Sequence, residues 1–277
     1  MQHALRVDRT IERLAARQFG DVDTLGQLRW RSVRAGFRSL RDRSERRAAS
    51  PVEIAGPPVA CGGMPPNASE TRQRLLDAAA RSFAEEGVYN ASLIEITRRA
   101  GQRNRSALNY HFGSREGVLC AVLERHVEFL ARREGELLEI ALRAPDDDVA
   151  SVVEAIVRPA AELAESGWRG RCCLVIIAEV TGENPAHYSP QLQAVINRTG
   201  GYDVYALLAK RMADVGEEVS NERFALITTF VLRSVADRAR LLDRRGRKGR
   251  PQLDYETFVR NLVAMAAAAM SAPLLRA

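Results

Sequence analysis

From residue 67 onward, apolar side chains recur every three or four positions, which is the period of an amphipathic α-helix. The first stripe of this kind consists of Leu75, Leu76, Ala79 and Phe83. Asn67, followed three residues later by Glu70, has the spacing of a capping box, and Gly87 is a residue type that often ends a helix. The pattern therefore predicts a helix over residues 69–86.

The same period continues to the end of the chain, and no alternating pattern typical of a strand competes with it. Ser92 with Glu95 repeats the helix-start signal, and Ser114 opens a long helix. The sequence therefore predicts an all-α protein of about nine helices. We expect them over residues 69–86, 92–100, 105–111, 114–142, 145–165, 172–181, 189–213, 221–243 and 253–271.

The residues before this helical part have a different composition. Residues 1–50 are rich in arginine and indicate helix only weakly, whereas residues 51–66 hold five prolines and three glycines, as in a linker. We expect either a disordered basic arm or sequence upstream of a true start at Met64. The predicted division is a basic extension or mis-assigned start at 1–66, a DNA-binding domain at 67–115, and a helical ligand-binding and dimerisation domain at 116–277.

Charge is informative only where it clusters. The chain has a net charge of +6, but residues 1–63 hold 12 arginines against 7 acids, and residues 64–277 hold 29 basic against 28 acidic residues. Within 98–115 there is no carboxylate between Arg98, Arg99, Arg103, Arg105 and Arg115. Such a cluster suits phosphate binding, and the alternative is an ordinary solvated helix face.

Two of the predicted helices, 92–100 and 105–111, are short and are joined by a turn that contains Gly101. This is typical of a helix-turn-helix, whose second helix enters the major groove of DNA. Leu108 and Phe112 lie four residues apart and therefore share one face, which we expect to pack inward. The sequence thus predicts a three-helix DNA-binding domain.

The polar residues of this segment divide into two groups. Asn109 lies off the packed face and can bond adenine through its amide, while Arg105, Arg103 and Ser106 can reach base edges or phosphates. Phosphate contacts are expected from Ser92, Tyr110, His111 and Arg115. The alternatives are that Tyr110 and His111 are simply packed or exposed, and that Ser92 is only a helix cap.

Two stretches carry a family resemblance. The run Thr71-Arg-Gln-Arg-Leu-Leu-Asp-Ala-Ala with Phe83-Ala-Glu-Glu-Gly87, then Ala100-Gly101 and Tyr110-His-Phe-Gly-Ser-Arg-Glu116, resembles the N-terminal domain of TetR/AcrR-family transcriptional regulators. The resemblance covers about 50 residues. It implies an all-α homodimer with a C-terminal ligand pocket and a four-helix dimer interface, which a small molecule releases from its operator. The sequence departs from the family in a turn, Gly101–Asn104, that is one residue longer, and in Ile94, where a polar or basic residue is common.

The last two predicted helices carry apolar stripes that we expect to form the subunit interface, the alternative being that they belong to the core of one subunit. The stripes are Phe224, Ile227, Thr228, Val231 and Val235, and Phe258, Leu262, Met265, Ala266 and Ala269. A two-fold dimer places its recognition helices about 34–36 Å apart, so the operator should be nearly palindromic. No effector class is predicted. Aromatic or polar residues that can line a pocket are Trp168, Cys172, Cys173, His187, Tyr188, Tyr202 and Tyr205.

Other classes of protein find little support. No apolar run reaches the ~18–20 residues of a membrane helix, the N-terminus lacks the apolar core of a secretory signal, and the four cysteines have no CxxC spacing, which favours a cytoplasmic protein with reduced thiols. The four histidines are far apart, and no nucleophile motif or Gly-rich phosphate loop occurs. We therefore expect no enzyme, no metal and no cofactor. The predicted function is a ligand-responsive repressor, and the alternative is an all-helical interaction protein or enzyme without DNA binding.

Overall fold

The computed structural model describes residues 66–104, 106–182, 188–243 and 251–274. Within these ranges the chain is all-α, as predicted, and contains no strand. The extension over residues 1–65 lies outside the described residues. The helices are α3 (Pro66–Glu86), α4 (Leu93–Arg99), α5 (Ala107–Phe112), α6 (Arg115–Ala141), α7 (Val149–Glu165), α8 (Trp168–Val180), α9 (Pro190–Arg198), α10 (Tyr202–Arg211), α11 (Glu217–Asp243) and α12 (Tyr255–Met270), with a 3-10 turn η2 (Ala213–Val215) before α11.

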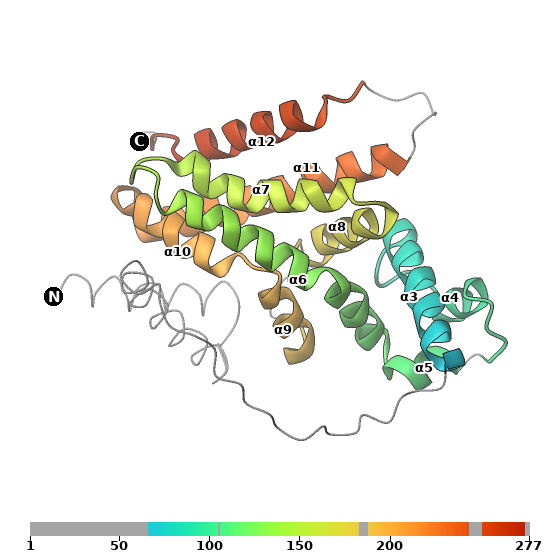
Figure 1. The fold of residues 1–277 in the computed structure, drawn as a ribbon. Coiled ribbons are helices and arrows are strands. Elements are labelled where there is room, and N and C mark those ends of the chain that lie inside the picture. Colours follow the sequence, from blue (N-terminus) through green and yellow to red (C-terminus); the bar gives the residue numbers. More distant parts are fainter. Residues whose placement is uncertain (1–65, 105, 183–187, 244–250, 275–277) are drawn as a thin grey trace, which may run out of the picture.

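The helices divide into a small group at one end of the molecule and a larger bundle (Figure 1). We call α3, α4 and α5 the head, and α6 to α12 the body. The long helix α6 leaves the head and packs along α7, while α8 packs against α3 on one side and against α7 and α11 on the other. The helix α12 covers α7 and α11. The head is therefore attached to the body through α6 and α8.

Side chains that cap the helices set several of their first residues, as the sequence predicts for Ser92 and Ser114. Each serine accepts a hydrogen bond from a backbone N–H three residues later, which satisfies a donor that the helix itself leaves free. The predicted start of the fifth helix at 145 is wrong, because the Asp148 side chain accepts the N–H of Ser151 and α7 begins at Val149.

The predicted helix over 189–213 is in fact two helices, α9 and α10. Gly200 and Gly201 interrupt it with φ angles of +113° and +98°, which L side chains rarely adopt. The Glu134 carboxylate from α6 accepts the N–H of Gly201 at 2.7 Å and lies where a side chain on Gly200 would be. A pair of glycines inside an apolar pattern marks this break, and the periodicity alone hides it.

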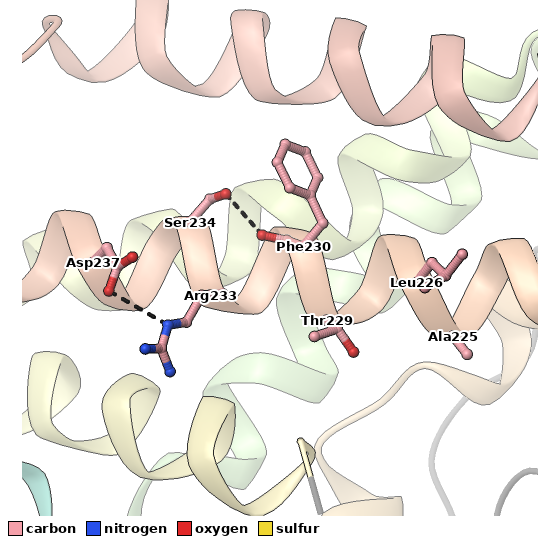
Figure 2. A pocket seen from close by; sticks show the side chains of 7 residues that line it. All are labelled: Ala225, Leu226, Thr229, Phe230, Arg233, Ser234 and Asp237. Atoms are coloured by element: carbon pink, nitrogen blue, oxygen red, sulfur yellow. Dashed lines mark hydrogen bonds and ion pairs between the residues drawn. The ribbon is translucent and has the colours of Figure 1, made fainter.

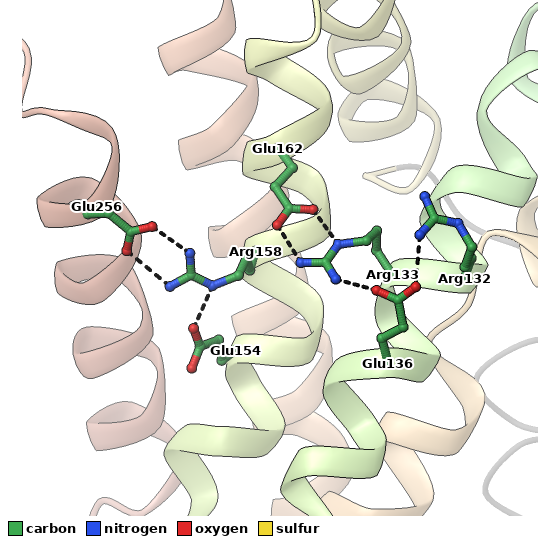
Figure 3. A network of polar contacts seen from close by, with 7 residues as sticks. All are labelled: Arg132, Arg133, Glu136, Glu154, Arg158, Glu162 and Glu256. Carbon is green, nitrogen blue, oxygen red and sulfur yellow. Dashed lines mark hydrogen bonds and ion pairs between the residues drawn. The ribbon is translucent and has the colours of Figure 1, made fainter.

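Arginine–carboxylate pairs join α6, α7 and α12 side by side (Figure 3). Arg133 on α6 donates two hydrogen bonds to Glu162 on α7, at 2.7 and 2.6 Å. Arg158 on α7 bonds Glu154 at 2.6 Å and reaches Glu256 at the start of α12 at 2.8 Å. The hydrogen bonds from these carboxylates raise the pKa of both arginines, so both pairs stay charged. The pairs fix α12 on the body.

The apolar stripe of α11 that was predicted to form the subunit interface is packed inside the subunit. Phe224, Ile227, Val231 and Val235 are buried, because α8 and α7 cover this side of α11. The outer face of α11 is a second, less regular set of residues. It consists of Ala225, Leu226, Thr229, Phe230, Arg233, Ser234 and Asp237, which line a groove of about 440 Å³ (Figure 2).

The stripe predicted on α12 is likewise divided between the two sides of that helix. Leu262 and Ala266 are buried against the body, whereas Met265 and Ala269 are exposed. In the part of the chain that the structure describes, no helix combines the length and the hydropathy needed to cross a membrane.

Candidate nucleic-acid interface

The head is held together by one large buried side chain from each of its helices. Phe83 of α3, Ile96 of α4 and Leu108 of α5 are almost completely buried. Helices α3 and α4, and α4 and α5, pack on each other, and α5 also packs on the start of α6. Two short helices are thus held at an angle by a third, which is the arrangement of a helix-turn-helix.

Ser92 lies exposed at the start of α4, where its Oγ accepts the Glu95 N–H at 3.4 Å. The predicted cap is confirmed. Its contact with a phosphate stays a prediction. Ile94, on the next turn of this end of α4, leaves 60% of its side chain exposed.

The turn between α4 and α5 begins at Gly101, whose φ of +72° allows the chain to leave α4. Arg103 is exposed in this turn, and Arg105 lies outside the described residues. The Asn104 Oδ1 accepts the N–H of Ser106 at 2.9 Å, and the Asn104 carbonyl accepts the N–H of Ala107 at 3.1 Å. Asn104 therefore sets the start of α5, a role that the sequence analysis missed although asparagine often forms such turns.

Helix α5 divides its side chains as the sequence predicts. Leu108 is buried, while Asn109 is exposed and Tyr110 exposes 83% of its surface. His111 is half-buried, with its ring edge-on to Tyr110 at 5.1 Å between centroids. Phe112 packs against the core and lies under the Arg72 guanidinium, 5.0 Å from the ring centroid. The polar side of α5, with Ser106 exposed just before it, is open to a partner.

Arg115, predicted to bind phosphate, has a contact within the chain. Its Nη1 donates to the carbonyl oxygens of Val88 at 2.8 Å and Ala91 at 2.6 Å. These carbonyls belong to the turn between α3 and α4, so the arginine ties that turn to the start of α6. A guanidinium has five donors, and a phosphate contact through the others stays a prediction.

The basic cluster predicted over 98–115 is smaller in the structure, because carboxylates outside that span neutralise part of it. Arg98 donates to Glu95 at 2.8 and 2.6 Å. Arg99 bonds Glu95 and also Glu85 and Glu86, which α3 brings close. The hydrogen bonds from Arg98 lower the pKa of Glu95 to about 2, so this carboxylate is charged at any ordinary pH. Arg98 and Arg99 are therefore paired cations, and counting charges along the sequence overstated the patch.

Two family models match the chain. One, described as bacterial regulatory proteins of the tetR family, covers residues 75–122, and the other, a tetracyclin repressor-like C-terminal domain, covers residues 154–269. The chain belongs to the TetR family. The first match covers α4 and α5 with their supports, and the second covers most of the body, so the predicted family is confirmed for both parts.

The curated relatives that the chain matches are transcriptional regulators. It is 48% identical over 56 residues to the HTH-type transcriptional regulator SrpR of Pseudomonas putida, covering 20% of this chain and 26% of SrpR. It is also 48% identical over 56 residues to the uncharacterized regulator TtgW of a second Pseudomonas putida strain, covering 20% of this chain and 41% of TtgW. AcrR of Shigella flexneri is 33% identical over 90 residues, covering 32% of this chain and 40% of AcrR. The chain thus spans less than half of the length of these relatives.

Solved structures of regulators also align with the chain at low identity. AibR in complex with isovaleryl coenzyme A and operator DNA aligns with 70% of this chain and 97% of its own, at 16% identity and a TM-score of 0.45. PfmR from Thermus thermophilus aligns with 73% of this chain and 100% of its own, at 22% identity and a TM-score of 0.42.

Proposed function

We propose that this TetR-family protein is a DNA-binding transcriptional repressor that binds a near-palindromic operator as a homodimer and is released by a small molecule. The observation that carries the proposal is the state of α5. Its buried Leu108 anchors the helix, while Asn109 and Tyr110 stand in solvent on the opposite side. A tyrosine that exposes 83% of its surface on a short, rigid helix is suited to a large polar partner such as the DNA backbone.

The division of labour on DNA follows from the chemistry of each side chain. Asn109 offers an amide to adenine, and Arg105, Arg103 and Ser106 reach base edges or phosphates. The residues proposed to bind phosphates are Ser92, Tyr110, His111 and Arg115. Residues 67–115 act as the DNA-binding domain and residues 116–277 as the ligand-binding and dimerisation domain. A regulator of this kind works in the cytoplasm, where its operator is.

The proposed dimer uses helices α11 and α12, within 221–243 and 253–271, through their outer faces. Leu226 is 59% exposed, Phe230 is 37% exposed and Met265 is 50% exposed. Exposed apolar side chains gathered on one helix are typical of a protein interface. The exposed alanines of α12 allow a partner helix to approach closely. They are Ala264, Ala268 and Ala269.

The proposed effector binds within the body. Cys172, Cys173 and Tyr205 from the predicted pocket set are buried there, and the Tyr205 hydroxyl bonds the Asn221 side chain. The hydroxyl of Thr228 is buried on α11 without a hydrogen-bond partner, which leaves a polar group for a ligand to satisfy. Trp168 contacts Arg81 of the head, and Tyr188 bonds the Val180 carbonyl, so these two have structural contacts. His187 and the Tyr202 side chain lie outside the described residues.

A gel-shift experiment tests the proposal. The full chain is titrated against duplexes from the DNA that flanks its own gene, with an unrelated duplex of equal length as competitor, at several salt concentrations. We expect sequence-selective binding that weakens steeply as salt rises, because bound phosphates release their counterions. Absence of binding at low salt refutes the proposal and favours an interaction protein or an enzyme. Selecting bound fragments from a random duplex library then gives the operator and shows whether it is palindromic.

A further inference from the structure

The turn between α3 and α4 is held from both sides by charged side chains of two different helices. The Val88 N–H donates to Glu179 Oε1 of α8 at 2.8 Å, and the Val88 carbonyl accepts from Arg115 of α6 at 2.8 Å. Because α4 begins only a few residues later, at Leu93, the position of this peptide sets the position of α4. A carboxylate from the body therefore reaches a backbone group of the head.

Gly87 provides the space that this contact needs. Its φ of +92° places the following N–H toward α8, and a Cβ at this position would lie 3.1 Å from Glu179 Oε1. A larger residue would therefore be strained in its backbone and would also press on the carboxylate. The glycine that ends α3 thus has a second task beside ending the helix.

A second set of contacts joins α8 to the head at its other end. Arg169 donates to Asp77 at 2.9 and 2.6 Å, and the Arg81 guanidinium lies 3.8 Å from the Trp168 ring centroid. The hydrogen bonds from Arg169, more than those from Arg125, lower the pKa of Asp77. The two attachment points on each helix are separated by about 15 Å, at 1.5 Å per residue. Helix α8 therefore runs parallel to α3 and is fixed to it at both ends.

The other side of α8 packs on α11, where Arg171 forms an ion pair with Asp243. Any change in the body that moves α8 relative to α6 must pull on the Val88 peptide, because Glu179 and Arg115 hold its two ends. The pull acts on the head at the residue that precedes the helix-turn-helix.

From these contacts we infer that Glu179 is a positioning residue that fixes the orientation of α4 and α5 on the body through its hydrogen bond to the Val88 N–H. The inference rests on the proposed function, in that the orientation it sets is the one that binds DNA. Glu179 does not contact DNA. The loss of its carboxylate should loosen the head while leaving its fold and its DNA-facing side chains in place.

Three variants of the full chain test this inference. Glu179→Met removes the acceptor at nearly constant length, Glu179→Gln keeps an acceptor oxygen, and Glu139→Gln is a matched control on an exposed carboxylate of α6. We expect hydrogen–deuterium exchange of the Val88 amide to rise about tenfold in the Met variant, which corresponds to one hydrogen bond to a charged group, and much less in the Gln variant. Unchanged exchange in the Met variant overturns the inference.

Orientation is measured without DNA, as the distance between spin labels on Arg103→Cys in the head and Asp146→Cys in the body. The labels go into a Cys61→Ser background, since burial raises the pKa of the Cys120 and Cys172 thiols to about 11 and Cys173 is buried too. We expect the distance distribution to widen or shift in the Met variant and to return toward the wild type in the Gln variant. The same distribution in all three variants overturns the positioning role.

Binding to the selected operator fragment completes the test. We expect the Met variant to lose about tenfold in affinity, with the Gln variant between it and the wild type. Raised Val88 exchange together with unchanged affinity contradicts the inference. If the wild-type protein binds no DNA, the proposed function fails, and the exchange and distance measurements still decide whether Glu179 positions the head.

Discussion

Helices α5 and α11 each leave an aromatic side chain in solvent, but they do so in opposite chemical surroundings. Tyr110 of α5 is 83% exposed beside Asn109 and His111, which all carry polar groups. Phe230 of α11 is 37% exposed beside Leu226 and Thr229 in an apolar groove (Figure 2). The comparison teaches that exposure marks both surfaces as sites for a partner, and that the neighbours of the exposed ring distinguish a polar partner from an apolar one.

The largest effect is expected from placing a charge in the apolar groove. Phe230→Glu should convert the dimer to monomer, since a buried, unpaired carboxylate at an interface is strongly unfavourable. Operator affinity should then fall by about a hundredfold or more, because one head alone makes half of the phosphate contacts. Analytical ultracentrifugation measures the mass and a gel shift measures the affinity.

Ile140→Glu is the matched control, because Ile140 is a similarly exposed apolar residue on α6, away from the outer face of α11. A Phe230→Glu protein that stays dimeric would show that the apolar neighbours do not mark the subunit interface. In that case the comparison between the two helices would lose its second half.

The next effect concerns how α5 and its support are held. Arg115→Met removes two hydrogen bonds to the turn carbonyls and should lower the free energy of unfolding by about 1–3 kcal/mol, as for hydrogen bonds to a charged group. Arg115→Lys should recover part of this loss while keeping the charge. Chemical denaturation measures both. If Arg115→Met instead leaves stability unchanged and lowers the slope of log K against log salt by about one, the arginine is chiefly a phosphate ligand.

The sequence predicted much of the head because its signals are local. A serine cap, a glycine with positive φ and apolar residues four apart specify α4 and α5 within a few residues of each other. The contacts that the sequence could not reveal are those between distant residues. Glu179 is 91 residues from Val88, and the carboxylates that pair with Arg99 lie on another helix.

In the body the apolar pattern is ambiguous rather than absent. Helix α11 has apolar residues on two sides, and the stripe with the better spacing is the one that α7 and α8 bury. The exposed set containing Leu226 and Phe230 is less regular, so periodicity favoured the wrong side. Which side faces a partner depends on where α7 and α8 lie, and that is decided by contacts far apart in the sequence.

A smaller and more selective effect is expected from the two exposed polar residues of α5. Tyr110→Phe removes one hydroxyl and should weaken binding to all duplexes by a few-fold, because a phosphate contact carries no sequence information. Asn109→Ala should cost about 1–3 kcal/mol on the preferred operator and little on others, because its amide reads a base. Affinities for the operator and for single-base variants measure the two cases. Equal losses and equal selectivity in both variants would refute the division between positioning and base reading.

The smallest effect concerns the paired cations at the end of α4. Glu95→Gln removes the charge that holds Arg98 and Arg99, so these arginines become available to phosphates. We expect tighter binding to any duplex at low salt, with the slope of log K against log salt steeper by up to about two units. Fluorescence anisotropy with an unrelated duplex measures this without the operator, and Glu139→Gln, whose partner Arg143 follows the end of α6, is the control.

Acid offers an independent check on the same pair. The folded-state pKa of Glu95 is lowered from 4.5 to about 2, so the pairing is fully present above pH 4.5 and is lost only as the pH falls toward 2. Wild-type binding between pH 5 and 8 should therefore show no step from Glu95, and an NMR titration of its carboxylate should reach its midpoint near pH 2. A midpoint near 4.5 would mean that Arg98 is already free in the wild-type head. The polar surface around α5 would then include the cations that the structure pairs within the chain.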